Sequence, residues 1–214
     1  MTSTSRKGLL TAWLNVPPEH EEEFNRWYNT EHIQERVGIP GFLNGRRYLS
    51  LEGEPKYFAL YELETPDAVY SEAYKRVRQN PTPWNRKIEA LFQDFVRNVY
   101  EEIFSYGSSS PQGAPYVLTV RVGVAPEKEN EFNAWYNEDH IPALLKVGGV
   151  RSGKRYRAVE GTPKYLAVYE LDNPEVIKSE AWVKARDYGR TSVIWPHLQG
   201  LQRNVGKLLF QLSK

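Results

Sequence analysis

Residues 24–33 read Phe-Asn-Arg-Trp-Tyr-Asn-Thr-Glu-His-Ile, and residues 132–141 read Phe-Asn-Ala-Trp-Tyr-Asn-Glu-Asp-His-Ile. The similarity continues at a constant offset of 108 residues without a gap, so that 24–72 aligns with 132–180 with 23 identities in 49 positions. A repeat of this length has the size of a domain and is too long for a solenoid unit. The sequence therefore predicts the same domain twice in one chain.

The repeat divides the 214 residues into two units of similar length. We predict a first repeat at 1–104, a linker at 105–115 and a second repeat at 116–214. The linker contains Tyr-Gly-Ser-Ser-Ser-Pro-Gln-Gly-Ala, a small and polar composition typical of flexible connections. Each repeat is long enough to bury a modest core.

The composition excludes several functional classes. The chain has 28 basic and 27 acidic residues and a formal net charge of +1, which gives no reason to expect nucleic acid or an anionic membrane as a partner. It has no cysteine, which excludes disulfides, zinc-thiolate sites and thiol catalysis. The apolar run at 8–14 is too short for a signal peptide, and no stretch approaches the ~20 apolar residues of a membrane span. We expect a soluble cytoplasmic protein.

Apolar periodicity and turn residues predict the order β-α-β-β-α-β in each repeat. In the first repeat, strands are predicted at 9–16, 42–51 and 56–63, helices from Pro18 to Gly38 and from Pro66 to Arg78, and a short helix with a strand within 91–104. The second repeat gives strands at 116–124, 150–159, 164–171 and 201–212, helices at 126–146 and 174–187, and a turn of helix at 195–197.

The strand at 56–63 is apolar on both faces, which is typical of a strand that is covered on both sides. Helices cover only one face of a β-α-β-β-α-β sheet, so the other repeat is the natural cover for the second face. The predicted fold class is α+β, with two ferredoxin-like repeats that form one α+β barrel within the chain.

The motif Trp-Tyr-Asn-x-(Glu/Asp)-His-Ile at the end of a helix, in a unit of this topology, resembles the dimeric α+β barrel superfamily and, within it, the EthD-like branch. The resemblance covers nearly the whole chain as two fused copies, whereas relatives usually pair two separate chains. Members include polyketide cyclases, muconolactone isomerases, monooxygenases and haem-containing enzymes. The second copy carries Pro142 after the motif where the first has Gln34, so we expect the two sites to have diverged, with the second closer to the family pattern.

His32 and His140 are the leading catalytic candidates. Each lies four residues after a tyrosine, Tyr28 or Tyr136, on one stripe of a regular helix that would face the sheet. An imidazole there could take and return a proton near neutral pH. The alternative is a structural histidine that bonds a backbone carbonyl. Tyr28 and Tyr136 would contact the substrate.

Arg47 and Arg155 precede Tyr48 and Tyr156 on the following strands. Consecutive strand residues point to opposite faces, so an arginine and the next tyrosine cannot both face one pocket. An inward tyrosine could donate a hydrogen bond to a substrate oxygen, and an inward arginine could hold a carboxylate. The alternative, which we favour, makes the tyrosines core residues and the arginines surface charges.

Other residues that recur in both repeats receive structural assignments. The tryptophans and tyrosines Trp27, Trp135, Tyr61 and Tyr169 are expected in the core. Asp139 and its counterpart Glu31 are expected in surface or capping contacts. Motifs for phosphate loops, nucleophile elbows, zinc and calcium are absent from the sequence. We expect no metal and no cofactor.

Three functional hypotheses follow. The first is a small-molecule pathway enzyme that acts on a cyclic or aromatic substrate by metal-free general acid/base chemistry, as an isomerase, cyclase or lyase. The second is a non-catalytic ligand-binding or accessory protein of a degradation pathway. The third, a haem-binding oxidative enzyme, comes from the family resemblance alone. The sequence leaves open a homo-oligomer of these pseudo-dimers.

Overall fold

The computed structural model describes residues 6–108 and 113–214. The first repeat contains β1 (Gly8–Asn15), η1 (Pro18–His20), α1 (Glu21–Trp27), η2 (Tyr28–His32), α2 (Ile33–Gly38), β2 (Phe42–Glu52), β3 (Tyr57–Leu63), η3 (Pro66–Tyr70), α3 (Glu72–Gln79), α4 (Pro83–Glu89) and β4 (Gln93–Gly107). The second contains β5 (Tyr116–Val124), η4 (Pro126–Lys128), α5 (Glu129–Ala134), η5 (Trp135–His140), α6 (Ile141–Leu144), β6 (Val150–Glu160), β7 (Tyr165–Leu171), η6 (Pro174–Lys178), α7 (Glu180–Arg186), α8 (Thr191–Ile194), η7 (Trp195–His197) and β8 (Leu198–Ser213).

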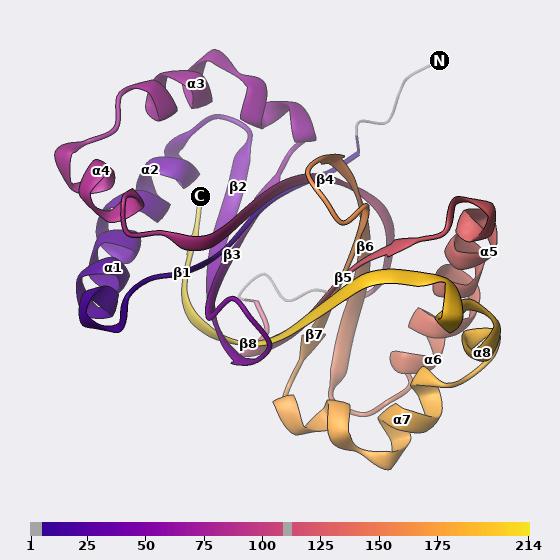
Figure 1. The fold of residues 1–214 in the computed structure, drawn as a ribbon. Coiled ribbons are helices and arrows are strands. Elements are labelled where there is room, and N and C mark those ends of the chain that lie inside the picture. Colours follow the sequence, from indigo (N-terminus) through magenta and orange to yellow (C-terminus); the bar gives the residue numbers. More distant parts are fainter. Residues whose placement is uncertain (1–5, 109–112) are drawn as a thin grey trace.

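The strands form one closed antiparallel barrel in the order β1-β3-β2-β8-β5-β7-β6-β4. The repeats join where β8 pairs with β2 and where β4 pairs with β6. Helices α1–α4 and α5–α8 lie on opposite sides of this barrel (Figure 1). The α+β barrel within one chain is therefore confirmed.

Strand alternation creates three cores. On β3, Tyr57, Ala59 and Tyr61 pack under the helices of the first repeat, whereas Phe58 and Leu60 point into the barrel. The second repeat has its own helix-side core around Phe132. The strand at 56–63 is thus covered on both faces, because the barrel interior is filled by side chains from both repeats.

Some element bounds differ from those predicted. β4 continues to Gly107, three residues into the stretch predicted as a linker at 105–115. The single helix predicted at 66–78 is divided into the 3-10 turn η3 and the separate helix α3. The break lies at Ser71, which has an extended backbone and caps α3 by accepting a hydrogen bond from the Tyr74 amide at 3.2 Å.

Candidate functional site in the second repeat

Each motif histidine ends a π-helical turn, η2 or η5, where the sequence predicts a regular helix. A π turn holds more residues than an α turn, so it aligns residues five apart. Accordingly, the rings of Trp27 and His32 lie 4.5 Å apart between centroids, and those of Trp135 and His140 lie 4.5 Å apart. The prediction of a continuous 3.6-residue stripe was wrong in this detail, although the histidines do lie against the motif tyrosines.

The motif arginines hold the π turns in place. Arg155 on β6 donates to the side-chain oxygens of Asn137 at 2.7 Å and Asn133 at 2.8 Å, and its guanidinium lies 4.4 Å from the Tyr136 ring centroid. In the first repeat, the equivalent partners of Arg47 are Asn29, Asn25 and Tyr28. Both arginines are buried, so the interpretation as surface charges was wrong. Each uses both terminal nitrogens to fix the helix to the sheet.

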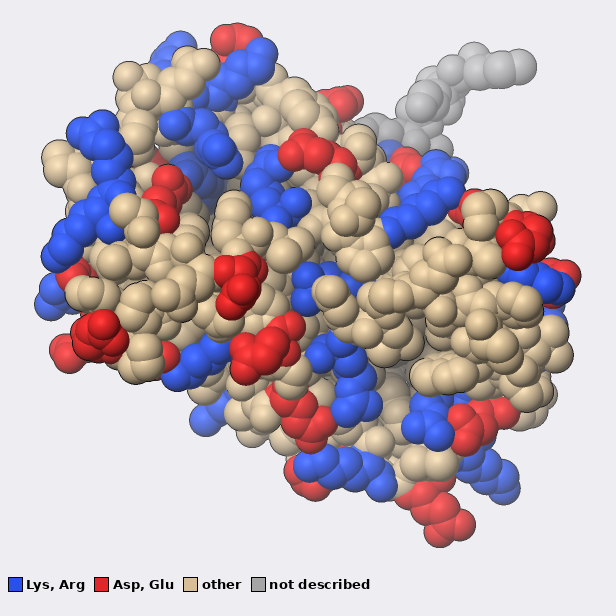
Figure 2. Space-filling model, in the orientation of Figure 1, with Lys and Arg blue, Asp and Glu red and all other residues tan. Residues whose placement is uncertain are grey.

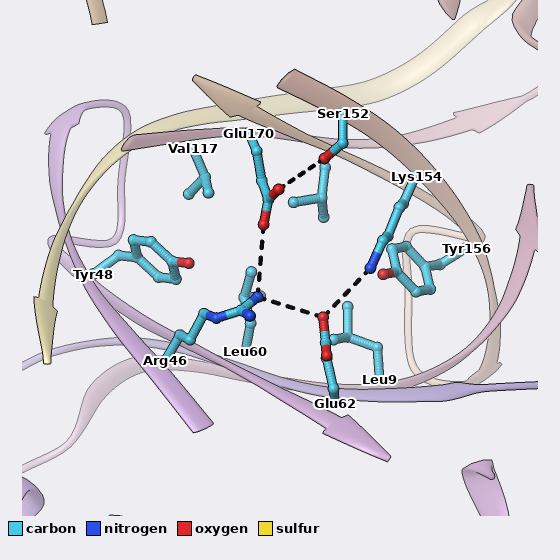
Figure 3. A pocket seen from close by; sticks show the side chains of 11 residues that line it. Leu9, Arg46, Tyr48, Leu60, Glu62, Val117, Ser152, Lys154, Tyr156 and Glu170 are labelled. Atoms are coloured by element: carbon cyan, nitrogen blue, oxygen red, sulfur yellow. Dashed lines mark hydrogen bonds and ion pairs between the residues drawn. The ribbon is translucent and has the colours of Figure 1, made fainter. Parts of the chain in front are cut away.

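Tyr48 and Tyr156 lie on the opposite face of the sheet from these arginines. Both hydroxyl-bearing rings are buried in the barrel interior, on different walls of a small hollow (Figure 3). Tyr156 therefore does not reach the helix side of the sheet, and it cannot polarise a substrate oxygen beside His140. The core interpretation describes the position of both tyrosines.

A cavity of about 330 Å³ lies between the helices and sheet of the second repeat. We call it the second-repeat cavity. Its lining includes Trp135, Tyr136, His140, Leu144, Tyr169, Trp182, Arg186, Trp195, Leu198, Leu201 and Arg203, together with three aliphatic residues of β5. Its volume falls within the range of small-molecule pockets, and its walls are mostly aromatic and aliphatic. Trp195 and Leu201 are 50% and 41% exposed and form its mouth.

Two polar atoms at this cavity lack hydrogen-bond partners among the residues that the structure describes. They are Nδ1 of His140, a residue 7% exposed, and the hydroxyl of Tyr169, a residue 1% exposed. Each has a polar neighbour just outside strict hydrogen-bonding geometry: the Tyr136 hydroxyl affects the pKa of Tyr169, and the Arg186 backbone carbonyl affects the pKa of His140. Unsatisfied buried polar groups cost about 1–3 kcal/mol each, so these two are the groups that a ligand or an ordered water in the cavity would satisfy.

The corresponding cavity of the first repeat is about 50 Å³. There Nδ1 of His32 is 3.4 Å from the Asn85 side-chain oxygen, and the Tyr61 hydroxyl donates to Tyr28 at 3.0 Å. The same residue types are therefore paired in the first repeat and unpaired in the second. This contrast makes the second-repeat cavity the candidate site.

Two aromatic residues close the first cavity. The strand register shows which positions of β4 and β8 are equivalent. Thr11 on β1 pairs with Asn98 on β4, and the matching Thr119 on β5 pairs with Asn204 on β8. Counting from these asparagines, Phe92 and Phe95 match Leu198 and Leu201. The Phe92 ring packs at 6.2 Å on Phe24 and 5.5 Å on Phe95, and thereby fills the space that leucines leave open in the second repeat.

Burial controls the ionisation of the polar groups. It lowers the pKa of His140 to about 4, and the positive charges of Arg155 and Arg186 lower this pKa further. Interaction with the backbone of Arg186 raises the pKa and so opposes part of the shift. Burial also raises the pKa of Tyr169 well above its usual value. At neutral pH the cavity therefore presents a neutral imidazole and a protonated phenol, a proton acceptor beside a hydrogen-bond donor.

Asp139, next to His140, makes a structural contact. It accepts hydrogen bonds from Arg190 Nε at 2.7 Å and from the Arg190 amide at 3.1 Å, which ties η5 to the loop after α7. Its counterpart Glu31 accepts from Trp27 Nε1 and Thr82. Both carboxylates thus bond residues other than the histidine beside them. Pro142 lines a separate groove between α6 and α7, so the Gln34/Pro142 difference is not what separates the two cavities.

Sequence reasoning missed Tyr169, Trp182 and Trp195 as cavity residues. Tyr169 was assigned to the core, where it lies, but it also lines the second-repeat cavity. An alignment of the last strands of the two repeats shows how the cavities differ, because Leu198 and Leu201 stand where the first repeat has Phe92 and Phe95. That substitution was the available signal for an open cavity.

The barrel interior holds a second polar group of residues, the barrel ion cluster, defined as Arg46, Glu62, Lys154 and Glu170. Arg46 Nη1 lies 3.4 Å from Glu62 and 3.7 Å from Glu170, and Lys154 Nζ lies 3.4 Å from Glu62. Figure 3 shows these side chains converging from opposite walls, with Ser152 donating to Glu170 at 2.9 Å. The cations are matched by carboxylates, so the cluster links the repeats through balanced charges.

The surface carries no extended field of one sign on the face shown in Figure 2, where basic and acidic side chains alternate. Within residues 6–108 and 113–214, no group of three or more His, Asp or Glu side chains is arranged to hold a metal ion. Over the same residues, the structure contains no helix with the length and hydropathy needed to cross a bilayer.

Comparison with known proteins gives the fold. A family profile described as a domain of unknown function, DUF4286, matches residues 115–185, within the second repeat. No curated protein matches the sequence significantly.

Solved structures match almost the whole chain. An anthrone oxidase-like protein superposes with a TM-score of 0.70 at 11% identity, covering 99% of this chain and 94% of its own. A proposed monooxygenase from Fusobacterium nucleatum subsp. nucleatum gives 0.69 at 10% identity, with 99% and 96% covered. A chlorite dismutase from Candidatus Nitrospira defluvii, in complex with imidazole, gives 0.64 at 13%, with 97% and 93% covered. These proteins share the dimeric α+β barrel fold with this chain, while the EthD-like resemblance stays a prediction.

Proposed function

We propose that the second-repeat cavity binds a small cyclic or aromatic molecule with a carbonyl or phenolic oxygen, and that His140 moves a proton on it. The observation that carries the proposal is the pair of unpartnered groups, His140 Nδ1 and the Tyr169 hydroxyl, at one aromatic cavity of about 330 Å³. Their counterparts in the first repeat are paired at a cavity of about 50 Å³.

The chemistry follows from the two protonation states. The Tyr169 phenol would donate a hydrogen bond to the substrate oxygen and stabilise negative charge that develops there. The neutral His140 imidazole would take a proton from a carbon next to the polarised carbonyl and return it at another position. The net reaction is an isomerisation, in which the proton count of the substrate does not change.

Haem is the cofactor that the family resemblance raises. His140 is the imidazole in the lining of the second-repeat cavity and would have to hold the iron, but its Nδ1 is buried among protein atoms and the cavity of about 330 Å³ is too small for the macrocycle, so the residues present do not fit haem. Arg186 and Arg203 line the cavity, but each is already paired with a carboxylate, Asp187 or Glu52. Bound haem would supply oxidative chemistry. A Soret band that appears on haem addition to wild type and is lost in His140→Ala would favour it over the proposed isomerisation.

A thermal-shift screen of wild type, His140→Ala and His32→Ala tests the proposal. The panel contains phenols, quinones, lactones, acyl aromatics and haem. We expect stabilisation of wild type and His32→Ala that is lost in His140→Ala, followed by turnover of the ligand class identified. Equal stabilisation of all three proteins would favour a non-catalytic binding role, and unchanged turnover in His140→Ala would overturn the assignment of His140.

A further inference from the structure

We propose a second, independent ligand site in the barrel interior, in which Arg121 on β5 binds the carboxylate of a small organic acid. The Arg121 side chain lies on the opposite face of β5 from Leu118, Val120 and Val122, which line the second-repeat cavity. The site therefore shares no side chain with the proposed catalytic cavity.

Arg121 is a buried cation without a counter-ion. The residue is 1% exposed, and it forms no ion pair with any carboxylate in the described part of the chain. Burial lowers its pKa to about 10, so it stays positively charged at neutral pH. An unpaired buried charge is costly, and native structures normally pair it or give it a ligand.

The barrel ion cluster provides the internal comparison. Arg46 and Lys154 point into the same barrel and each meets at least one carboxylate (Figure 3). Glu170 pairs in register with Val117, four residues before Arg121 on β5, which places the cluster about 13 Å away along the strand. The cluster therefore cannot neutralise Arg121.

The guanidinium is oriented but not satisfied. Its carbon lies 4.0 Å from the Trp13 ring centroid, a cation–π contact that holds the plane of the guanidinium. Nη2 donates to the Asn204 side-chain oxygen at 3.4 Å, while Nε and Nη1 have no acceptor among the described residues. Stacking uses the face of the guanidinium and leaves the in-plane N–H donors for a ligand.

Two further buried donors near Arg121 also lack acceptors. They are the Trp13 indole N–H and the Tyr100 hydroxyl, and burial raises the pKa of Tyr100, which keeps it protonated. The unpaired groups next to Arg121 are thus mainly donors, as an anion site requires. One unpaired cation matches one negative charge, which favours a monocarboxylate over a doubly charged phosphate.

Access is through an open groove of about 920 Å³ that has Arg121, Val96 and Gln202 in its lining. Glu21, Glu54 and Asp94 line the same groove with Lys56, so its rim carries net negative charge. Attraction of an anion must come from Arg121 itself, against the charge of this rim. We therefore expect selection for one charged group on a small body, with little long-range steering.

Calorimetric titration of the full chain with acetate, benzoate, phosphate and the neutral analogue acetamide, at constant ionic strength, tests the site. We expect one monocarboxylate per chain and at least tenfold weaker binding in Arg121→Met. The control Arg157→Met removes an exposed arginine that pairs with Glu101 outside the groove, and it should bind as wild type does. His140→Ala should also bind normally, which separates this result from the proposed catalytic function.

If Arg121→Met does not fold, the Arg121 Nε–H nuclear magnetic resonance signal of wild type gives the answer. That signal should move on acetate addition and not on acetamide addition. Tighter binding of phosphate than of acetate would overturn the monocarboxylate assignment. Binding that is equal in Arg121→Met, binding of acetamide as tight as acetate, or an Nε–H signal unmoved by any carboxylate would overturn the site.

Discussion

His32 and His140 show how one residue type takes two roles in equivalent positions. Both follow a π turn and both contact a tryptophan at 4.5 Å between ring centroids. Only His32 meets Asn85, whereas Nδ1 of His140 is left without a partner at an open cavity. The difference lies in the surroundings of the imidazole, which the motif itself does not encode.

The pH dependence of stability should report the burial of His140. Its folded-state pKa is about 4, below the usual 6.5, so between these values the unfolded chain takes up a proton that the folded chain does not. The stabilisation is complete above pH 6.5 and is lost as the pH falls toward 4, up to about 3 kcal/mol. Urea unfolding from pH 4 to 7 should show a smaller decrease for His140→Gln than for wild type. Identical pH profiles would contradict the buried neutral imidazole.

Site residues were only partly predictable from sequence. The motif located His140 and Tyr136 at the cavity, because residues near the end of an amphipathic helix face the sheet it covers. Tyr156 was favoured as a core residue, and it does lie in the barrel core, but strand alternation alone did not say whether Tyr156 or Arg155 faces the helices. Arg155 was assigned to the surface because a lone arginine usually lies there, and its asparagine partners on the π turn are visible only in the folded chain.

At the scale of elements, Arg47 and Arg155 form what we call the arginine clamp, which ties each π turn to the sheet. Arg155→Met would leave the oxygens of Asn133 and Asn137 without their charged donor, at a cost of about 2–4 kcal/mol in the free energy of unfolding. Arg155→Lys should not restore it, because lysine lacks the planar fork. Arg47→Met is the matched control, with a similar loss of stability but no loss of ligand binding. Unchanged stability in both variants would contradict the clamp.

The last strands determine which cavity is open. We expect Leu198→Phe with Leu201→Phe to close the second-repeat cavity and abolish ligand binding while the chain stays folded. The reverse pair, Phe92→Leu with Phe95→Leu, should enlarge the first cavity and cost about 1 kcal/mol per substitution. Thermal shifts with the screen's strongest ligand measure both. Retained binding in the phenylalanine pair would place the ligand elsewhere.

Element order was predictable, and element detail was less so. Proline positions and apolar alternation gave the β-α-β-β-α-β order, because those signals are local. The π turns were missed because the apolar pattern of the helices does not distinguish a π turn from an α turn, and the contacts of Arg47 and Arg155 with these turns form only in the folded chain. The extension of β4 to Gly107 depends on pairing with β6 of the other repeat, which a linker-like composition conceals.

At the scale of the molecule, the barrel closes through two seams between the repeats, β2 with β8 and β4 with β6. Closure was predictable from a strand that is apolar on both faces. The barrel ion cluster was not, because its charges come from four strands and meet only after closure. The two repeats share one barrel but differ in the volume of their helix-side cavities.

The barrel ion cluster should couple the repeats. Arg46→Met removes the arginine that meets both Glu62 and Glu170, and we expect a loss of about 3 kcal/mol in the free energy of unfolding because a buried carboxylate is left without its cation. Lys154→Met should cost less, since Glu62 keeps Arg46. Urea unfolding of both variants gives the comparison. A larger effect for Lys154→Met would contradict the central role of Arg46.

The stoichiometry of ligand binding tests the central claim most directly. The strongest cyclic or aromatic ligand from the screen would be titrated into the full chain by calorimetry, with His140→Ala and His32→Ala alongside. The account predicts one site per chain, lost in His140→Ala and kept in His32→Ala. Two equivalent sites per chain, or one site that survives in His140→Ala and disappears in His32→Ala, would contradict it.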